Sequence, residues 1–228
     1  MRQFQLTVSE IAALGGALRV TCAGPDPGAQ PGQALLALAN GAARPHPSTP
    51  PLLRLPLFYH TLPGGGAQCY LPPGHPLSSL VPGDVLDLLG PVGRGFRLPR
   101  RGSHLLVVAA APERLLPLIE AALEAGLAVT ALTPRSADLL PSDVELHRGP
   151  LTAELAQWAD LVALDVADPR ARAQHIRSLA PPRGPEYIQA LVVPPLPCGT
   201  GACQACWVEL TQPHLRKLAC VDGPVFTF

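Results

Sequence analysis

The sequence carries little charge and almost no lysine. Charged residues make up 15% of the 228 residues, Lys217 is the only lysine, and the formal net charge is zero. Proteins that bind DNA or RNA normally carry a basic excess, because their main attraction is to the phosphate backbone. The charge balance therefore argues against a general nucleic-acid-binding protein.

Long apolar runs are also missing. The longest candidate, Leu105–Pro112, is much shorter than the ~18 apolar residues that a membrane-spanning helix needs. The first ten residues alternate apolar and polar side chains and lack the apolar core of a signal peptide. We therefore expect no membrane span and a cytoplasmic location. In a reducing compartment, the six cysteines are more typical of metal ligands or buried thiols than of disulfides.

What the first part of the chain does contain is a series of short apolar or alternating segments. Clusters of Pro and Gly separate them, which is typical of a small antiparallel β-barrel. The expected strands are Phe4–Val8, Leu18–Cys22, Ala34–Ala39, Leu53–His60, Gln68–Leu71 and Val85–Leu89. We predict a barrel domain over residues 1–99, with a Pro-rich surface loop at Pro45–Pro51.

From residue 100 onward, apolar strands alternate with helices. Strands that are apolar throughout indicate a parallel sheet covered on both faces, here a Rossmann-like domain over residues 100–193. The expected strands are His104–Ala110, Leu127–Leu132, Asp160–Val166 and, as the final strand, Ile188–Val193. The expected helices are Glu113–Ala125 with Gly126 as C-cap, Thr152–Trp158 with Thr152 as N-cap, and a helix opened by Asp168 and Pro169.

Four cysteines near the end of the chain have the spacing of an iron–sulfur site. Cys198, Cys203 and Cys206 are followed, after thirteen intervening residues, by Cys220, which makes the pattern C-x4-C-x2-C-x13-C. Plant-type [2Fe–2S] clusters use a C-x4-C-x2-C loop and a fourth thiolate from elsewhere in the chain. We therefore predict that these cysteines bind one [2Fe–2S] cluster in a small lobe over residues 194–228.

The residues between the cysteines agree with this prediction. Gly199 and Gly201 permit positive φ and a close approach of the backbone, and Ala202 keeps the wall of the loop small. Amide groups of such a loop can point at the sulfides and stabilise their negative charge. Structural zinc is the alternative, although zinc ribbons usually pair C-x2-C with a second C-x2-C. Cys22 and Cys69 lie in expected strands and are interpreted as buried hydrophobic residues.

These motifs, taken in order, resemble the electron-transfer (iron–sulfur) subunit of dihydroorotate dehydrogenase, in the ferredoxin–NADP reductase-like superfamily. The resemblance is carried by CGTGACQAC and CVDGPVF, and by Pro31-Gly32-Gln33, Pro51–Arg54, Pro82-Gly83-Asp84 and Gly90–Phe96. It implies an FAD-binding barrel, a nucleotide-binding α/β domain and a cluster lobe. It also implies a hetero-oligomer with the FMN-containing catalytic subunit in pyrimidine biosynthesis, in which electrons pass from FMN through the cluster to FAD and NAD.

The sequence departs from this family at both nucleotide sites. Where the family's flavin strand carries Arg-Pro-x-Ser, this chain has Leu55–Phe58, and its later Gly-x-Gly-Thr segment is replaced by Gly74–Ser78. The adjacent Arg54 is the remaining candidate for holding FAD. Where a glycine-rich turn meets the dinucleotide, this chain has Ala109–Glu113, whose Cβ atoms and carboxylate oppose a phosphate. FAD binding is therefore uncertain from the sequence, and NAD binding is not expected.

Three functions are compatible with these patterns. The first is an accessory electron-transfer subunit that carries one [2Fe–2S] cluster and has little activity alone. The second is a complete reductase subunit that also binds FAD and NAD. The third is a structural or regulatory subunit in which a cluster or zinc ion only holds the lobe together. The sequence contains no recognisable nucleophile–base motif, so we assign no catalytic residue.

Overall fold

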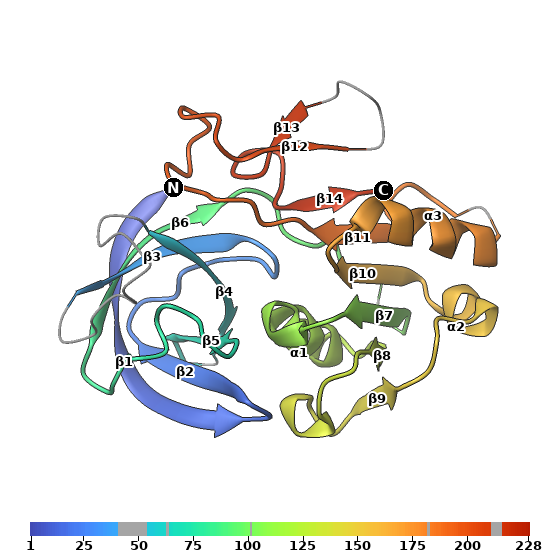
Figure 1. Cartoon of the computed structure of the whole chain (residues 1–228). Coiled ribbons are helices and arrows are strands. Elements are labelled where there is room, and N and C mark those ends of the chain that lie inside the picture. Colours follow the sequence, from blue (N-terminus) through green and yellow to red (C-terminus); the bar gives the residue numbers. More distant parts are fainter. Residues whose placement is uncertain (41–53, 63, 101, 182, 211–215) are drawn as a thin grey trace.

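The computed structural model describes residues 1–40, 54–62, 64–100, 102–181, 183–210 and 216–228. Its strands form a closed barrel, a six-stranded sheet and a two-stranded hairpin (Figure 1). This is the predicted combination of barrel, α/β sheet and small C-terminal lobe. The Pro-rich loop predicted at Pro45–Pro51 lies outside the described residues. None of the helices in the described part is long and apolar enough to cross a membrane.

The first part of the chain folds into a closed antiparallel barrel, as predicted. Its strand order is β1-β2-β5-β4-β3-β6. The bounds are Arg2–Leu14 (β1), Ala17–Ala23 (β2), Ala34–Asn40 (β3), Leu55–Thr61 (β4), Ala67–Leu71 (β5) and Val85–Val92 (β6). β1 is longer than the predicted Phe4–Val8, because it continues to pair with β2 after a register shift between Val8 and Glu10.

Alternate residues of the barrel strands point inward, as the two-residue period of a strand requires. Leu57 of β4 lies in this interior core together with the two predicted buried thiols, Cys22 and Cys69. Burial raises the pKa of Cys22 to about 12. Phe58 and Tyr70 instead belong to a second core that continues into the α/β domain. The two domains are therefore joined by apolar packing.

The second part of the chain forms a sheet with the order β14-β11-β10-β7-β8-β9. Helix α1 lies on the side of this sheet that faces the barrel, and α2 and α3 lie on the other side (Figure 1). Neighbouring strands from β11 to β9 are parallel, and β14 is antiparallel to β11. The bounds are His104–Ala109 (β7), Leu116–Glu124 (α1), Ala128–Leu132 (β8), Val144–His147 (β9), Ala153–Trp158 (α2), Leu161–Asp165 (β10), Pro169–Leu179 (α3), Ile188–Leu191 (β11) and Val225–Thr227 (β14).

Two details of the α/β prediction were wrong. Ile188–Val193 is not the final strand, because the tail returns as β14 and the Phe228 amide donates to the Ile188 carbonyl at 3.1 Å. The helix expected over Glu113–Ala125 is interrupted: a 3₁₀ turn at Pro112–Arg114 precedes α1. Pro117 explains the break, since a proline is tolerated in the first turn of a helix but not inside it. Strand β9 was not predicted.

The predicted helix ends are confirmed. Gly126 follows α1 with a φ of 78°, the left-handed conformation that glycine adopts at a helix C-terminus. The Thr152 side chain accepts a hydrogen bond from the Leu155 amide at 3.3 Å, and the Asp168 side chain accepts one from the Ala171 amide at 2.9 Å. These bonds satisfy amides that lack partners within the helices.

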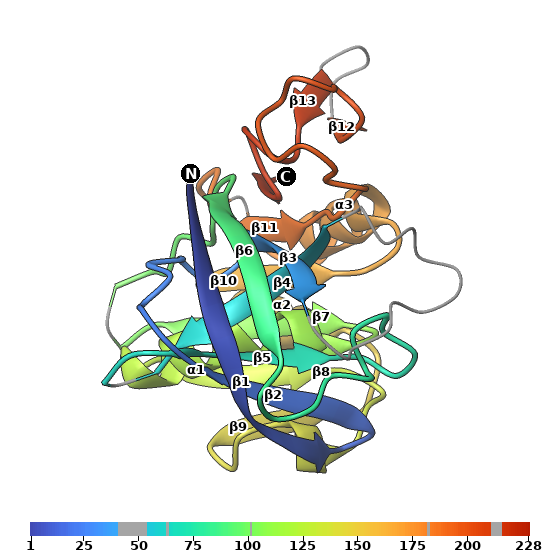
Figure 2. The same cartoon turned by 90° about the vertical axis from the view of Figure 1, so that its left-hand side faces the viewer.

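The end of the chain forms a lobe that projects from the barrel and the sheet (Figure 2). Its hairpin pairs β12 (Trp207–Glu209) with β13 (Arg216–Leu218). Gly93, just after β6, has a φ of 77°, and a Cβ atom there would lie 2.0 Å from the Gly223 carbonyl oxygen. The adjacent Arg94 amide donates to that same carbonyl. The base of the lobe is therefore held tightly against the end of the barrel.

Candidate metal centre

The structure brings the four predicted cysteines together as two pairs of free thiols. The Sγ atoms of Cys198 and Cys203 are 3.2 Å apart, and those of Cys206 and Cys220 are 3.1 Å apart. The first three cysteines lie on the loop before β12, and Cys220 follows β13, so the hairpin returns the fourth thiol to the loop. The Ala219 amide donates to the Cys206 carbonyl at 2.9 Å, which aligns the second pair.

The two pairs differ in their exposure to solvent. Cys206 and Cys220 are 1% and 3% exposed. Cys203 is exposed and Cys198 is half-buried. One pair therefore faces solvent, and the other faces the body of the protein.

Backbone amides of the loop point at the sulfur atoms. Hydrogen bonds from the amides of Cys203 and Thr200 to Cys198 lower the pKa of Cys198 to about 6. Burial raises the pKa of Cys220 to about 12, the neighbouring Cys206 thiol adds to this rise, and the Gly201 amide opposes it. The loop amides therefore stabilise negative charge on Cys198, as an anion-binding turn does, whereas burial disfavours it on Cys220.

The two predicted glycines adopt the conformations that the loop needs. Gly199 and Gly201 have φ values of 67° and 80°. A Cβ atom at Gly199 would lie 2.8 Å from the Leu36 Cδ1 atom, and one at Gly201 would lie 3.0 Å from the Val221 Cγ2 atom. The loop thus rests against β3 of the barrel on one side and against the turn after β13 on the other.

Sequence reasoning missed two contributors to this loop. Gln204 has a φ of 54° and makes the turn between Cys203 and Cys206, although non-glycine residues rarely adopt this conformation. Thr200 supplies an amide to Cys198, whereas the predicted Ala202 is exposed on the outer surface. No residue type in the sequence marks either role.

The donor set fits a two-metal cluster better than a single ion. In a [2Fe–2S] cluster each iron takes two protein ligands, so two pairs of thiols are needed. A structural zinc ion needs its four ligands around one point. The pairwise arrangement therefore favours iron–sulfur chemistry over zinc.

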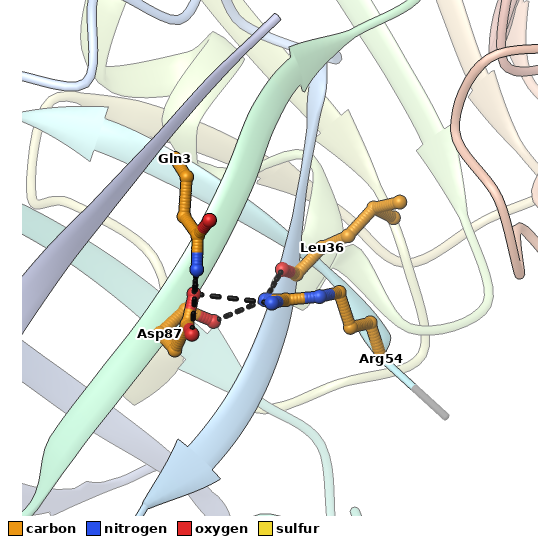
Figure 3. Close-up of polar contacts among 4 residues, drawn as sticks. All are labelled: Gln3, Leu36, Arg54 and Asp87. Carbon is orange, nitrogen blue, oxygen red and sulfur yellow. Dashed lines mark hydrogen bonds and ion pairs between the residues drawn. The ribbon is translucent and has the colours of Figure 1, made fainter. Parts of the chain in front are cut away.

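Arg54, the predicted candidate for FAD, lies in a polar network on the barrel wall (Figure 3). Its Nη1 atom donates to the Asp87 carbonyl at 2.7 Å and to the Leu36 carbonyl at 3.3 Å, and its Nη2 atom lies 3.1 Å from the Asp87 carboxylate. Gln3 donates to the same carboxylate at 2.9 Å. Arg54 thus links the start of β4 to β3 and β6, and it would have to leave these partners to bind a phosphate.

A crevice of about 1010 Å³ lies at the carboxyl ends of the parallel strands, where Rossmann-like domains bind dinucleotides. Beside it, the 3₁₀ turn after β7 carries the buried Glu113, which is ion-paired with Arg135. Asp165 at the end of β10 accepts from Arg114 at 2.8 Å. Burial raises the pKa of Asp165, and the bond from Arg114 opposes that rise. Beside the crevice, Arg114 and Arg135 are thus already paired with buried carboxylates, whereas Arg148 and Arg172 line the crevice itself.

Comparisons with known proteins agree with both the fold and the lobe. Residues 196–228 match the family model described as the iron–sulfur cluster-binding domain of dihydroorotate dehydrogenase B. The structure of an NADH-dependent reduced ferredoxin–NADP oxidoreductase is similar with a TM-score of 0.63 and 21% identity, over 97% of this chain and 87% of that one. The flavohaem-like FAD/NAD-binding domain of nitric oxide dioxygenase from Vibrio cholerae has a TM-score of 0.57 and 16% identity, over 83% of this chain and 98% of that one.

A third solved structure belongs to the ferredoxin reductase of carbazole 1,9a-dioxygenase. It is similar with a TM-score of 0.60 and 18% identity, over 83% of this chain and 66% of that one. At these identities the likeness establishes a common fold, that of ferredoxin reductase-like proteins. The chain thus has this fold, and its last residues resemble the cluster-binding end of a dihydroorotate dehydrogenase electron-transfer subunit.

Proposed function

We propose that this chain is an electron-transfer subunit that carries one [2Fe–2S] cluster on Cys198, Cys203, Cys206 and Cys220. The observation that carries the proposal is the arrangement of the four thiols in two pairs, with Sγ–Sγ distances of 3.2 and 3.1 Å. The match of residues 196–228 to an iron–sulfur cluster-binding domain supports it independently.

The chain's own residues would set the properties of this centre. When bound, the cluster would supply one-electron redox chemistry. Amides of Thr200, Gly201 and Cys203 donate to cysteine sulfurs and stabilise their negative charge. Cys206 and Cys220 are buried and exclude water from one side, whereas Cys203 leaves the other side open to a partner. Hydrogen bonds to sulfur and solvent exposure are the protein's main means of tuning such a potential.

The partner that we propose is an FMN-containing dihydroorotate dehydrogenase subunit, in a cytoplasmic hetero-oligomer of pyrimidine biosynthesis. The description of the matching family model and the motifs along the chain support this choice. Neither the donor set nor the fold names a reaction that this chain performs alone. We therefore propose an accessory subunit of an oxidoreductase.

A structural staple is the second candidate. Strands β12 and β13 have only three residues each, so the lobe has few backbone bonds of its own and would depend on whatever binds its thiols. Metal binding contributes directly to folding in such small units. Under this alternative, loss of a cysteine removes the lobe and the assembly without a separate effect on electron transfer.

The test begins with protein purified without oxygen. The proposal predicts a red-brown protein with iron and sulfide in equal amounts and an electron paramagnetic resonance signal after reduction. A colourless protein that contains zinc would overturn it. Cys203→Ala is expected to remove the signal, whereas Cys69→Ala, a control inside the barrel, is expected to keep it. If Cys203→Ala abolishes assembly with the partner and no redox step depends on the lobe, the staple is correct.

A further inference from the structure

A cavity of about 360 Å³ lies between the C-terminal lobe and the body of the protein, and we call it the lobe cavity. Its walls come from the linker after β6, from β11 and the loop before it, from the hairpin with the turn that follows it, and from β14. Figure 1 shows the hairpin above β11 and β14. The lobe cavity shares no lining residue with the crevice at the carboxyl ends of the parallel strands, so it is a separate space.

Three cations line the lobe cavity, and two of them have no partner of opposite charge. Arg97 is ion-paired with Glu186. Arg94 and Lys217, the only lysine of the chain, make no ion pair among the described residues. Every Asp and Glu of the sequence lies in the described part, so no carboxylate side chain elsewhere in the chain is left to pair with them. Like charges that line one cavity repel each other, and an anion between them is attracted by both.

The backbone holds both unpaired cations in place. The Arg94 amide donates to the Gly223 carbonyl, and the Arg94 carbonyl accepts from the Val225 amide at 3.4 Å. Lys217 lies opposite Val208 in the hairpin, and cross-strand partners share one face. Val208 is buried in the core that it shares with the sheet, so Lys217 lies on the face of the hairpin that is turned to the body.

The side chain of Gln189 forms part of the wall beside Arg97. Its Oε1 atom accepts from the Arg97 amide at 2.8 Å. Its Nε2 atom donates to the Arg97 carbonyl at 2.9 Å and to the Glu186 carbonyl at 3.2 Å. Both donor hydrogens and the acceptor are thus used, so Gln189 supports the linker and leaves the charges of the cavity to the other side chains.

Asp222 is the remaining charged residue of the lining. Its Oδ2 atom accepts from the Leu218 amide at 3.0 Å, within the turn after β13. Three cations against two carboxylates leave one net positive charge in the lining. The lobe cavity therefore attracts an anion, and Asp222 is the one group that weakens this attraction.

We propose that the lobe cavity binds a small oxyanion of the phosphate class, which bridges Arg94 at the end of the barrel and Lys217 of the lobe. Guanidinium and ammonium groups both donate strong, charge-assisted hydrogen bonds to phosphate oxygens. Because the two cations belong to different parts of the fold, the bound ion joins the lobe to the body. Binding therefore stabilises the folded protein in proportion to the occupancy of the site.

The bound oxyanion also opposes reduction of the lobe. Lys217 and Asp222 flank Cys220 in the sequence, so the lobe cavity lies beside one of the proposed cluster ligands. Negative charge near an iron–sulfur centre makes the addition of an electron less favourable, and by reciprocity reduction weakens the binding of the anion. This effect rests on the proposed function, whereas the binding site itself does not.

The first test measures the binding of inorganic phosphate to the full chain by calorimetry at pH 8, with sodium chloride used to keep the ionic strength constant. Arg94→Met and Lys217→Met are each expected to weaken binding about tenfold or more, because each removes a charged donor. Arg100→Met, an exposed residue outside the lobe cavity, removes the same charge and should leave the affinity unchanged. If phosphate does not bind, or if only Arg148→Met in the crevice weakens it, the proposal is wrong.

Asp222→Asn provides a variant with the opposite expected sign. The asparagine keeps an oxygen that can accept from the Leu218 amide and loses the negative charge, so phosphate should bind about threefold more tightly. A lobe damaged by substitution would weaken binding in every variant. Weaker binding in Asp222→Asn, or unchanged binding in both Arg94→Met and Lys217→Met, would overturn the proposal.

The second test separates the site from its effect on reduction. Redox titrations followed by electron paramagnetic resonance are run with and without saturating phosphate. Phosphate should lower the midpoint potential of the unmodified protein and of Arg100→Met, and it should have no effect on Lys217→Met at the same concentration. An unchanged potential in the unmodified protein would refute the redox effect. Phosphate binding through Arg94 and Lys217 in a protein without an iron–sulfur signal would refute the proposed function and support the site.

Discussion

The Tyr70 hydroxyl of β5 donates to the Glu120 carboxylate of α1, across the contact between the barrel and the α/β domain. The effect of removing this hydroxyl on the free energy of unfolding can be predicted. Tyr70→Phe removes the 2.6 Å bond to Glu120 and leaves a buried carboxylate with weaker partners. A hydrogen bond to a charged group contributes about 1.5–3 kcal/mol. We expect the free energy of unfolding at pH 7 to fall by about that amount, which corresponds to roughly a ten- to hundredfold rise in the proton affinity of Glu120.

The sign of the pH dependence follows from the direction of the Glu120 pKa. Burial raises this pKa in the folded state above the ordinary value of 4.5, so Glu120 favours folding when it is protonated and loses that contribution as the pH rises. Tyr70→Phe raises the folded-state pKa further, so its cost should be smaller near pH 4 than at pH 7. Urea unfolding followed by circular dichroism at the two pH values measures both costs.

Tyr187→Phe is the matched control for this prediction. Tyr187 is also buried, but its hydroxyl donates at 2.5 Å to the carbonyl of Ala156, which does not titrate. Its loss should cost about 1 kcal/mol at both pH values. If Tyr70→Phe costs less than this control at pH 7, or costs the same at both pH values, the hydrogen bond from Tyr70 to a charged Glu120 does not stabilise the fold as argued.

Three further predictions concern other parts of the fold. Gly93→Ala should lower the free energy of unfolding, measured by urea titration, by at least ~2 kcal/mol, because its Cβ atom would lie 2.0 Å from the Gly223 carbonyl oxygen. The control Gly83→Ala has a φ of 96° but an open environment, so it should cost about half as much. Burial lowers the pKa of His75 to about 4, so stability should fall as the pH drops from about 6.5 toward 4, by at most ~3 kcal/mol, and His75→Gln should remove that dependence. Asp168→Ala should cost about 1 kcal/mol in thermal unfolding, since it removes the N-cap of α3.

Features that depend on neighbouring residues could be predicted well. The barrel strands follow from alternating apolar residues between Pro and Gly turns, and the helix ends at Gly126, Thr152 and Asp168 follow from side chains that bond their own backbone. The start of α1 was misplaced because the effect of Pro117 on the helix was not considered. The sequence contained that information.

Features that depend on distant segments could not be predicted. Strand β14 has only three residues and forms because the tail returns to the exposed edge of β11, which no local pattern indicates. The same holds for the left-handed Gln204 and for the amide of Thr200, whose roles exist only when the loop closes around the thiols. Their residue types are ordinary for a loop.

The sequence alone predicted Cys198, Cys203, Cys206 and Cys220 as a ligand set, because an iron–sulfur site demands thiolates at spacings that a short loop can satisfy. Only the tertiary structure decided how they pair and which pair faces solvent, since both depend on where the hairpin returns the last thiol. It also decided that side chains fill the space between strands β4 and β5 of the barrel and helix α1. Whether a cleft is open depends on contacts between residues far apart in the chain. The spacing of residues along the chain does not reveal these contacts.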